Sequence, residues 1–348
     1  MNRKVIKSIL NKKLNDWVKS IKDEKVQKLV KANTIVTGGA IANLLLNEEV
    51  KDFDLYFKDK ATTFAVAQYY ANEFNNRNKN HKNKLGGVAK AYVLDGETLR
   101  PDGRGGYEFI DRTSELAKEY ANQGKVLSRM IAGTTPDRIK IIVRSDGVAA
   151  EDGKQEVLDA PFEDAVDVLS DLDQLDEKLL EAGQEGQTKD PYRPVFLSTN
   201  AITLADKVQL VTRFYGSPED IHKNYDFVHC TNYFDFGSGE LVLKQEALEC
   251  LMNKELKYHG SKYPLCSVIR TRKFIQRGFH INAGQYLKMC FQLSQLDLTN
   301  IDVLEDQLCG VDSCYFMQLI EGLRSKQEND PNFKVEETYV ASIIDRIF

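Results

Sequence analysis

Two aspartates and a glycine pair are the residues in this sequence whose types and spacing could do chemistry. Asp52 and Asp54 alternate with apolar residues in the segment 52–57. In a strand, successive side chains point to opposite faces, so both carboxylates would share one face and the apolar side chains the other. Gly38-Gly39 ends an apolar run and allows a tight turn at the start of a helix. Two carboxylates beside such a turn suit a divalent metal that carries phosphates.

The elements around these residues have the lengths that such a site requires. Thr34 to Thr37 is a short β-branched run, and residues 40–46 are apolar and compatible with a helix. Residues 47–51 are mostly polar and join that helix to the strand predicted over 52–57. A glycine pair alone usually marks a turn, and Asp-x-Asp alone is usually a solvated strand face. Their order along one strand–helix–strand unit favours a site.

The segment 34–57 resembles the signature of the DNA polymerase β-like nucleotidyltransferase superfamily. It is most similar to the head domains of CCA-adding tRNA nucleotidyltransferases and poly(A) polymerases, written Gly-Gly-x-Val-Arg-Asp-x-Leu-Leu-Gly and then Asp-x-Asp. The positions in register are Gly38, Gly39, Ile41, Leu45, Leu46, Asp52 and Asp54. The Arg-Asp pair of the pattern is replaced by Ala42-Asn43, and its closing glycine by Asn47. This departure argues against a strict CCA-adding enzyme.

The resemblance implies nucleotidyl transfer, in which an acceptor hydroxyl attacks the α-phosphate of an NTP such as ATP and pyrophosphate leaves. It implies that Asp52 and Asp54 hold Mg²⁺ or Mn²⁺, and that the amides of Gly38 and Gly39 cradle phosphates. The acceptor that fits the motif best is an RNA 3′ end. A protein hydroxyl and a small molecule stay open as acceptors. So does a nucleotidyltransferase-like module, of a phage for example, that is kept for binding or assembly with little or no catalysis.

A third acid is expected, because two-metal phosphoryl-transfer sites use one to bind the second ion and orient the attacking hydroxyl. In the superfamily this acid lies on a neighbouring strand of the same sheet. Our candidate is Asp226, as a metal ligand and catalytic acid in a strand predicted over 225–233. Its rivals Asp111 and Asp146 are at turns, where aspartate needs no special explanation. His229 is more typical of a packed strand histidine than of a ligand.

A basic cluster follows in the C-terminal part. Arg270, Arg272 and Arg277 fall within about two turns of a helix predicted over 267–277, and Lys262 is nearby. Such a cluster can bind a triphosphate or a nucleic-acid backbone, although a solvated helix face has the same composition. We predict that Arg270 and Arg272 bind the nucleotide by neutralising phosphate charge.

The order of the predicted elements indicates an α/β fold in two parts. Residues 1–240 would form the catalytic domain, a small mixed sheet with helices on one face and an insertion at about 85–190. Residues 241–348 would form a helical C-terminal domain. Helices are predicted over 2–32, 62–75, 113–130, 245–254, 267–277, 282–296, 303–308 and 314–324. Further strands are predicted over 89–94, 107–110, 138–143, 195–204 and 208–214, and Ser217-Pro218 is predicted to cap a short helix.

Charge is distributed unevenly along the chain. The whole chain of 348 residues has a formal net charge of −5. Lysines are concentrated in residues 1–33, in a helix whose thin apolar stripe would pack on the domain and leave the lysines in solvent. Asp and Glu are concentrated in residues 151–190, which read as a linker or loop with at most a short helix.

Composition limits the cellular compartments and the kinds of partner that we expect for this protein. No apolar run approaches the roughly 20 residues that span a bilayer, and the basic N-terminus lacks the apolar stretch of a secretory signal. The six cysteines are scattered with no Cys-x-x-Cys and histidine pattern, so a zinc site is not expected and the thiols should be reduced. We therefore expect a cytoplasmic protein, in the host cytoplasm if the chain is viral. Its partners should be an NTP and an RNA acceptor, without a membrane.

Overall fold

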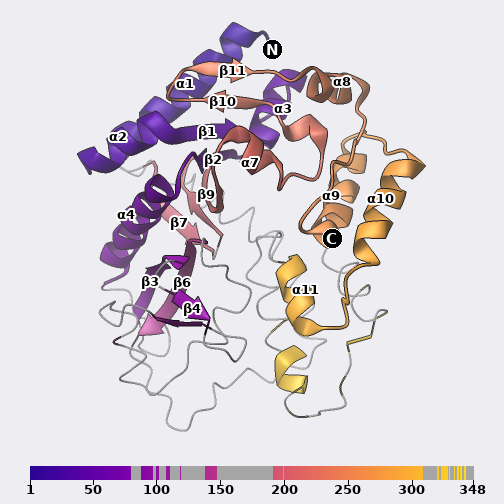
Figure 1. Cartoon of the computed structure of the whole chain (residues 1–348). Helices are drawn as coiled ribbons and strands as arrows, with labels where there is room; N and C mark the ends of the chain where they lie inside the picture. The colour runs from indigo at the N-terminus through magenta and orange to yellow at the C-terminus, as the bar shows by residue number, and fades with distance from the viewer. Residues whose placement is uncertain are drawn as a thin grey trace.

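The central element of the computed structural model is a seven-stranded mixed sheet with the strand order β11-β10-β1-β2-β9-β8-β7 (Figure 1). This confirms the α/β fold. The structure describes residues 1–79, 88–96, 99–101, 107–109, 118, 138–146, 191–198 and 200–308, with scattered residues between 320 and 341. The strands of the sheet are β1 Thr34–Thr37, β2 Phe53–Phe57, β7 Pro194–Leu197, β8 Ala201–Leu204, β9 Val208–Tyr215, β10 Tyr233–Asp235 and β11 Glu240–Val242.

Helices α1 to α4 contribute buried residues to one hydrophobic core with β2. The described α-helices are α1 Arg3–Ser20, α2 Glu24–Asn33, α3 Gly39–Leu46, α4 Lys60–Asn78, α7 Pro218–His222, α8 Gln245–Asn253, α9 Pro264–Gln276, α10 Ala283–Leu293 and α11 Ile301–Leu308. Figure 1 shows α1, α2 and α4 together on one side of the molecule and α9, α10 and α11 grouped on the other. Within the described residues, none of the helices combines the length and the apolar character that crossing a bilayer requires.

The N-terminal segment is two helices where one was predicted. The break falls at Asp23, whose carboxylate accepts hydrogen bonds from the amides of Lys25 and Val26 and so begins α2. On α1, Ile6 is fully buried whereas its neighbour Val5 is exposed. The stripe packs on the domain as expected; its buried members on α1 are Ile6, Leu10, Leu14, Trp17 and Val18.

The two faces of β2 separate the core from the candidate site. Phe53, Leu55 and Phe57 belong to the main hydrophobic core, together with residues of α1, α2 and α4. The Trp17 indole donates a hydrogen bond of 2.8 Å to the Tyr70 hydroxyl inside this core and joins α1 to α4. The alternation predicted for this strand is therefore confirmed, and its even-numbered side chains lie on the other face.

The pairing of the strands brings the glycine turn to the acids. β1 runs antiparallel to β2, with Val36 opposite Leu55, so the end of β1 lies beside the beginning of β2. On the other side β2 runs parallel to β9, with Asp54 opposite Gln209. The order of elements that the motif predicted is thus the order found.

Two predicted strands differ in the structure. The strand predicted over 195–204 is a hairpin of β7 and β8. The segment 225–233 is not a strand of the sheet: its centre is a short 3₁₀ helix, Val228–Cys230. Its backbone pairs with the C-terminal part instead, because Val228 N–H donates to Lys257 O at 3.1 Å and His259 N–H donates to Asp226 O at 2.8 Å.

The described part of the insertion contains two small antiparallel sheets. β3 Val88–Leu94 pairs with β6 Lys140–Asp146, and β4 Leu99–Pro101 pairs with β5 Tyr107–Phe109. These strands confirm the three predicted there, with ends that differ by a few residues. Asn75 of α4 holds β3 through hydrogen bonds with both backbone groups of Ala91. The predicted helix 113–130 and the acidic segment 151–190 lie essentially outside the described residues, and the domain boundary at residue 240 stays a prediction.

The capping and C-terminal predictions agree with the structure. Ser217 caps α7 with a reciprocal pair of hydrogen bonds to Asp220, and Pro218 is at the first helical position. The helices predicted over 245–254, 267–277, 282–296 and 303–308 correspond to α8, α9, α10 and α11. Most of the helix predicted over 314–324 lies outside the described residues.

We predict that Gly237→Ala destabilises the β10–β11 hairpin. A Cβ atom at Gly237 would lie 2.4 Å from the Ala32 carbonyl oxygen at the end of α2, so the backbone would have to move. Urea unfolding should show a loss of about 1–3 kcal/mol, the usual cost of overpacking. Gly284→Ala in α10 is the control, because a Cβ there meets nothing within 4 Å. Equal stability of Gly237→Ala and the unmutated protein would contradict this packing.

Candidate active site

The two acids of the motif lie at the beginning of β2. Asp54 is half-buried and lies on the face opposite the core residues Phe53 and Leu55. Asp52 comes just before the strand, and its side chain reaches solvent. Surrounding protein nonetheless raises the pKa of the Asp52 carboxyl by burial, against the opposing charge of Lys51. A carboxylate that is desolvated yet reachable from solvent gains more from a bound cation than a fully hydrated one.

Gly38 allows the backbone to approach Asp54 closely. Its φ of 84° is in the region that favours glycine. A Cβ atom at this position would lie 3.5 Å from Asp54 Oδ2 and 3.3 Å from the Tyr225 hydroxyl. Gly39 begins α3 directly after this turn, so the start of a helix is next to a carboxylate of β2.

The two glycine amides have different surroundings. Gly38 N–H donates to the Cys230 carbonyl at 3.1 Å and is engaged in the fold. The amides of the first turn of α3, from Gly39 onward, have no acceptor within the helix. Phosphate binding at this turn would therefore use Gly39 and the residues after it, where the sequence had indicated both glycines.

Asp226 is buried and paired with an arginine. Its Oδ2 is 2.8 Å from Arg270 Nη1, and its Oδ1 accepts from the Phe227 amide at 3.1 Å. Burial works to lower the pKa of Arg270, but the charge of Asp226 overcomes this and raises it. Asp226 was predicted on a strand of the sheet, and the structure places it on the segment that pairs with the C-terminal part. Its role as a metal ligand stays a prediction.

Cys230 connects the two regions of negative charge. Burial raises the pKa of its thiol, and the carboxylates of Asp226 and Asp54 add to this effect. Both acids therefore act on one buried thiol, from two different parts of the chain. The residue opposite Asp54 on the adjacent strand β9 is Gln209, which carries no charge.

The predicted basic cluster is divided among different partners. Arg270 faces Asp226, whereas Arg277 donates to Asn43 Oδ1 at 2.6 Å and to Glu48 Oε2 at 2.5 Å, at the end of α3. Arg272 is exposed, as expected for a residue two positions from Arg270 on a helix, because such residues point to different sides. Among the rival acids, Asp146 ends β6 in the insertion and Asp111 lies outside the described residues.

His222 supports the glycine turn, although the sequence gave it no role. Its Nδ1 is 3.1 Å from Lys244 Nζ, and its Nε2 is 2.8 Å from the Thr37 hydroxyl, next to Gly38. An ammonium group only donates, so Nδ1 accepts and Nε2 carries the proton of a neutral ring. Burial lowers the pKa of His222 to about 4, and the charge of Lys244 contributes. No motif marks this histidine; only the capped helix α7 that ends with it does.

Tyr225 is a second residue that the sequence did not single out for the site. Its hydroxyl is buried near Gly38 and Asp54, and no hydrogen-bond partner for it is found among the described residues. Burial raises its pKa well above the ordinary value, and the negative charge of Asp54 acts in the same direction. The phenol therefore stays protonated and offers a donor beside the acids.

His229 fits the interpretation as a packed histidine. It is 1% exposed, and its ring packs against Phe227, Phe274 and Phe279. Burial lowers its pKa to about 4, so the ring is neutral at pH 7.

The donor set at the acids fits a metal that shares its coordination with a substrate. In the part of the chain that the structure describes, no three or more His, Cys, Asp or Glu side chains are grouped to hold a metal. Mg²⁺ is commonly bound by one or two carboxylates, with phosphates and water completing its octahedron. Asp52 and Asp54 supply such a pair.

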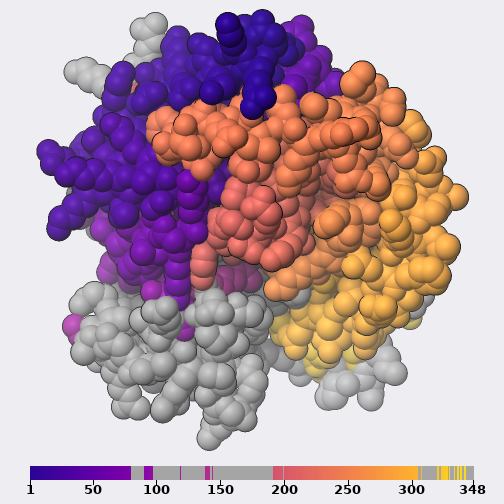
Figure 2. Space-filling model, turned by 45° about the horizontal axis from the view of Figure 1, so that its top comes forward, coloured from indigo at the N-terminus to yellow at the C-terminus, as the bar shows by residue number. Residues whose placement is uncertain are grey.

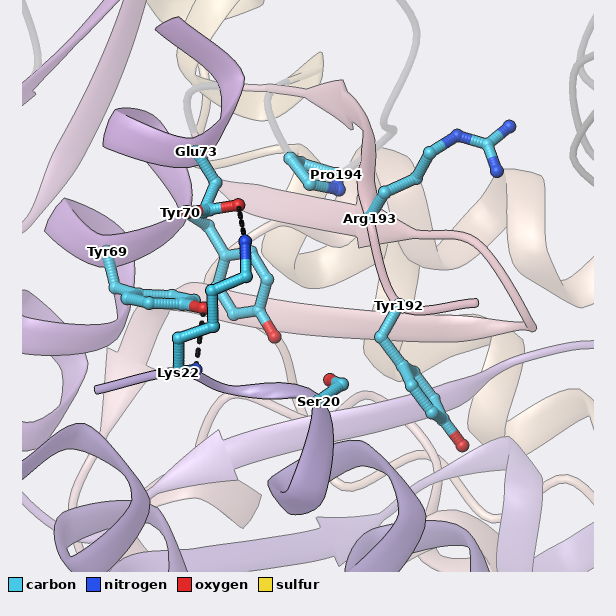
Figure 3. Close-up of a pocket in the computed structure, with 8 residues that line it drawn as sticks. All are labelled: Ser20, Lys22, Tyr69, Tyr70, Glu73, Tyr192, Arg193 and Pro194. Atoms are coloured by element: carbon cyan, nitrogen blue, oxygen red, sulfur yellow. Dashed lines mark hydrogen bonds and ion pairs between the residues drawn. The ribbon is translucent and has the colours of Figure 1, made fainter. Parts of the chain in front are cut away.

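A separate pocket lies between the link from α1 to α2, helix α4 and the segment before β7 (Figure 3). Figure 3 shows the Lys22 side chain reaching Glu73, at 3.3 Å, beside Tyr69 and Tyr70. Its other lining residues are Ser20, Tyr192, Arg193 and Pro194. None of them belongs to the candidate site.

We predict that Gly38→Ala destabilises the protein by about 1–2 kcal/mol, because an L-residue is strained at positive φ and the methyl group would lie 3.3 Å from the Tyr225 hydroxyl. Gly39→Ala is the matched control, since a Cβ there meets nothing within 4 Å. Both can be compared by thermal unfolding. Two variants of equal stability would rule out the tight approach at Gly38.

We also predict that His222 makes stability depend on pH. The unfolded chain binds a proton on histidine below about pH 6.5, whereas the folded pKa is about 4. The free energy of unfolding should therefore fall as the pH decreases from about 6.5 to about 4. In His222→Gln the decrease between pH 7 and pH 5 should be smaller. The exposed His259 provides the control variant His259→Gln, and identical pH dependence in all three proteins would contradict the assignment.

Comparisons with known proteins give a family and some weak likenesses. Residues 8–254 match the model of the Gabija anti-defense 2 (Gad2) family. A protein of Bacillus phage SPbetaL7 described as "Gabija anti-defense 2" is 24% identical over 133 residues, which are 38% of this chain and 32% of that protein. The match thus spans about a third of that relative's length.

Two solved structures resemble the chain at 10% identity and a TM-score of 0.33. One is a Thermotoga maritima CCA-adding enzyme complexed with tRNA, for which the match covers 93% of this chain and 57% of that one. The other is a tRNA-processing enzyme in an apo form, with coverages of 90% and 61%. At this TM-score neither likeness decides the fold or the activity. The family model matches well over half of the residues, and the chain belongs to the Gad2 family.

Proposed function

We propose that this protein is a metal-dependent nucleotidyltransferase that acts against the Gabija defence. The observation that carries the proposal is the approach of Asp54 to Gly38, because it places a carboxylate of β2 at the beginning of a helix. The amides at the start of a helix can bind phosphates. A carboxylate at the same place repels phosphates unless a cation lies between the two groups. The family name supplies the biological direction.

The metal has a limited part in this proposal. A Mg²⁺ or Mn²⁺ ion held by Asp52 and Asp54 supplies charge stabilisation at the α-phosphate when it is bound. The remaining work belongs to the chain itself. The first-turn amides of α3 bind the triphosphate, and the buried Tyr225 phenol donates a hydrogen bond beside Asp54. His222 holds Thr37, and through it the glycine turn, in place.

Arg270 and Asp226 have linked roles in the proposal. They are bound to each other at 2.8 Å. Asp226 would hold a second metal ion as the third acid, and Arg270 would neutralise triphosphate charge beside it. Arg272 can contribute at most long-range charge, because it points to another side of α9 than Arg270 does.

The acceptor that the motif favours is an RNA 3′ end. The family name suggests a protein acceptor as the second possibility. A hydroxyl of a Gabija protein would make nucleotidyl transfer the means of inactivation. A small-molecule acceptor stays open. A different function, binding without catalysis, is supported by the engagement of Gly38 and Arg270 within the fold and by an anti-defence role that does not itself require chemistry.

We predict that Asp52→Asn together with Asp54→Asn abolishes nucleotidyl transfer. Purified protein would be incubated with Mg²⁺ and α-³²P-labelled NTPs, with mixed RNA or purified Gabija proteins as acceptors. Label transfer should fall by at least about a hundredfold, because mutation of residues that only hydrogen-bond to metal ligands already lowers activity by up to about that factor. Asp16→Asn, on α1 and outside the site, is the matched control.

Protection of phage in a Gabija-carrying host separates catalysis from binding. The double variant should lose protection if the protein acts by transfer. Full protection by the double variant, with no labelling of any acceptor by the unmutated protein, would sink the enzymatic proposal and favour the binding module.

A further inference from the structure

Helix α10 has its polar side chains on the inside and apolar ones on the outside. The carbonyl oxygen of Gln285 accepts from the Tyr258 amide at 3.0 Å. The carbonyl oxygen of Gln292 accepts from the Tyr258 hydroxyl at 2.5 Å and from the Ser261 amide at 3.2 Å. Met289 lies between these glutamines and is 1% exposed. The helix is therefore attached to the domain mainly by two hydrogen-bonding glutamines and one methionine.

The opposite side of α10 consists of apolar residues in solvent. At 100° per residue, Leu287, Cys290 and Phe291 lie opposite this inner side, and Tyr286 lies on the flank. Leu287 is 53% exposed and Phe291 is 61% exposed. We call Tyr286, Leu287, Cys290 and Phe291 the outer α10 face. A surface helix normally has the reverse arrangement, so this face is expected to be covered in use.

Helix α9 adds two further exposed apolar residues to this region. It packs beside α10, with Thr271 in contact with Met289, and it exposes Val268 and Ile275. Figure 2 shows this orange region of the chain on the right side of the molecule, open to solvent. The outer α10 face together with Val268 and Ile275 forms the α9–α10 surface.

Basic residues dominate the sequence of α9 and α10. Residues 256–296 contain no Asp or Glu, in a chain whose net charge is −5. The same stretch contains seven basic residues: Lys257, Lys262, Arg270, Arg272, Lys273, Arg277 and Lys288. Three of them pair with acids elsewhere in the chain, namely Lys257, Arg270 and Arg277. Lys262, Arg272, Lys273 and Lys288 are exposed.

We infer that the α9–α10 surface docks a protein whose contact region is apolar at its centre and acidic at its rim. Aromatic residues and arginine are enriched, and acids depleted, at the core of protein interfaces. A second copy of this chain would bring like charges face to face, which disfavours self-association here. A nucleic acid would make few favourable contacts with Leu287, Val268 and Ile275, because its surface is polar and strongly charged.

This inference rests on the proposed function for the identity of the partner, a protein of the Gabija system. Docking on α9–α10 would hold that protein beside the site, because Arg270 of α9 binds Asp226 and Arg277 binds Glu48 at the end of α3. The surface would thus select the target, while the acids of β2 act on it.

The test is binding of purified Gabija proteins to the full-length chain, measured by biolayer interferometry. Leu287→Ser with Phe291→Ser should raise Kd at least about thirtyfold, since a single central anchor can account for that much. Val5→Ser on α1 removes a comparably exposed apolar side chain far from this surface and should leave Kd unchanged. Added salt should weaken binding, and bound partner should slow alkylation of Cys290, followed by peptide mass spectrometry.

Several results would overturn the inference. The inference fails if the unmutated chain does not bind Gabija proteins, or if the double variant binds them with the same Kd. It also fails if the unmutated chain sediments as a dimer and the double variant as a monomer. A double variant that loses binding to single-stranded RNA but keeps binding to Gabija proteins would overturn it as well. Thermal unfolding checks that the double variant is folded. We expect it to be folded, because Leu287 and Phe291 are exposed. Asp52→Asn with Asp54→Asn should bind like the unmutated chain. Binding that needs Leu287 and Phe291, without any nucleotidyl transfer, would thus reject the enzymatic proposal and keep this one.

Discussion

The close approach of the Asp54 carboxylate to the backbone at Gly38 is the constraint on which the candidate site depends. Antiparallel pairing of β1 with β2 brings the end of one strand to the beginning of the other. Glycine suits this position because its φ is 84° and a Cβ there would lie 3.3 Å from the Tyr225 hydroxyl. The buried pair of His222 and Thr37 then holds the end of β1 on the same face of the sheet as Asp54. The strand, the turn and the helix start form one rigid unit as a result.

The C-terminal helices are joined to this unit by an apolar cluster, in which Ala42 of α3 packs with Phe227 and Met289, and by two ion pairs. Arg270 binds Asp226 beneath α9, and Arg277 binds Glu48 and Asn43 at the end of α3. Removing Arg270 costs more than its pair with Asp226 contributes, because the buried Asp226 charge is left poorly solvated. The pairs therefore specify where α9 lies rather than adding much stability. They also fix α10, whose outer face is apolar, at a set position relative to the acids.

Local pattern was enough to predict the half of the site that is contiguous in sequence. The alternation around Asp54 and the break at Gly38-Gly39 follow from short-range rules, and the structure has both. Asp226 was predicted on a strand because its neighbours are apolar and aromatic. Tertiary packing decided otherwise, since residues 226–228 pair with 257–259. Periodicity within one segment carries no information about a partner thirty residues away.

The roles of His222 and Arg277 were beyond prediction for the same reason. Lys244 and Thr37 meet His222 from distant positions, and Arg277 reaches α3 across more than two hundred residues. The division of the arginines could have been partly foreseen, because residues 270 and 272 cannot point the same way on a helix. The sequence of α10 does not show that its glutamines face the protein and its apolar residues face solvent, because glutamine is rarely buried.

The most direct test of the central claim is a crystal structure of the protein with Mn²⁺ and a non-hydrolysable NTP analogue, recorded with anomalous scattering from manganese. The proposed site requires a manganese peak about 2.1 Å from carboxylate oxygens of Asp52 and Asp54. It also requires the triphosphate at the first turn of α3. A nucleotide bound elsewhere, or these two carboxylates without metal at saturating Mn²⁺ and nucleotide, would contradict it.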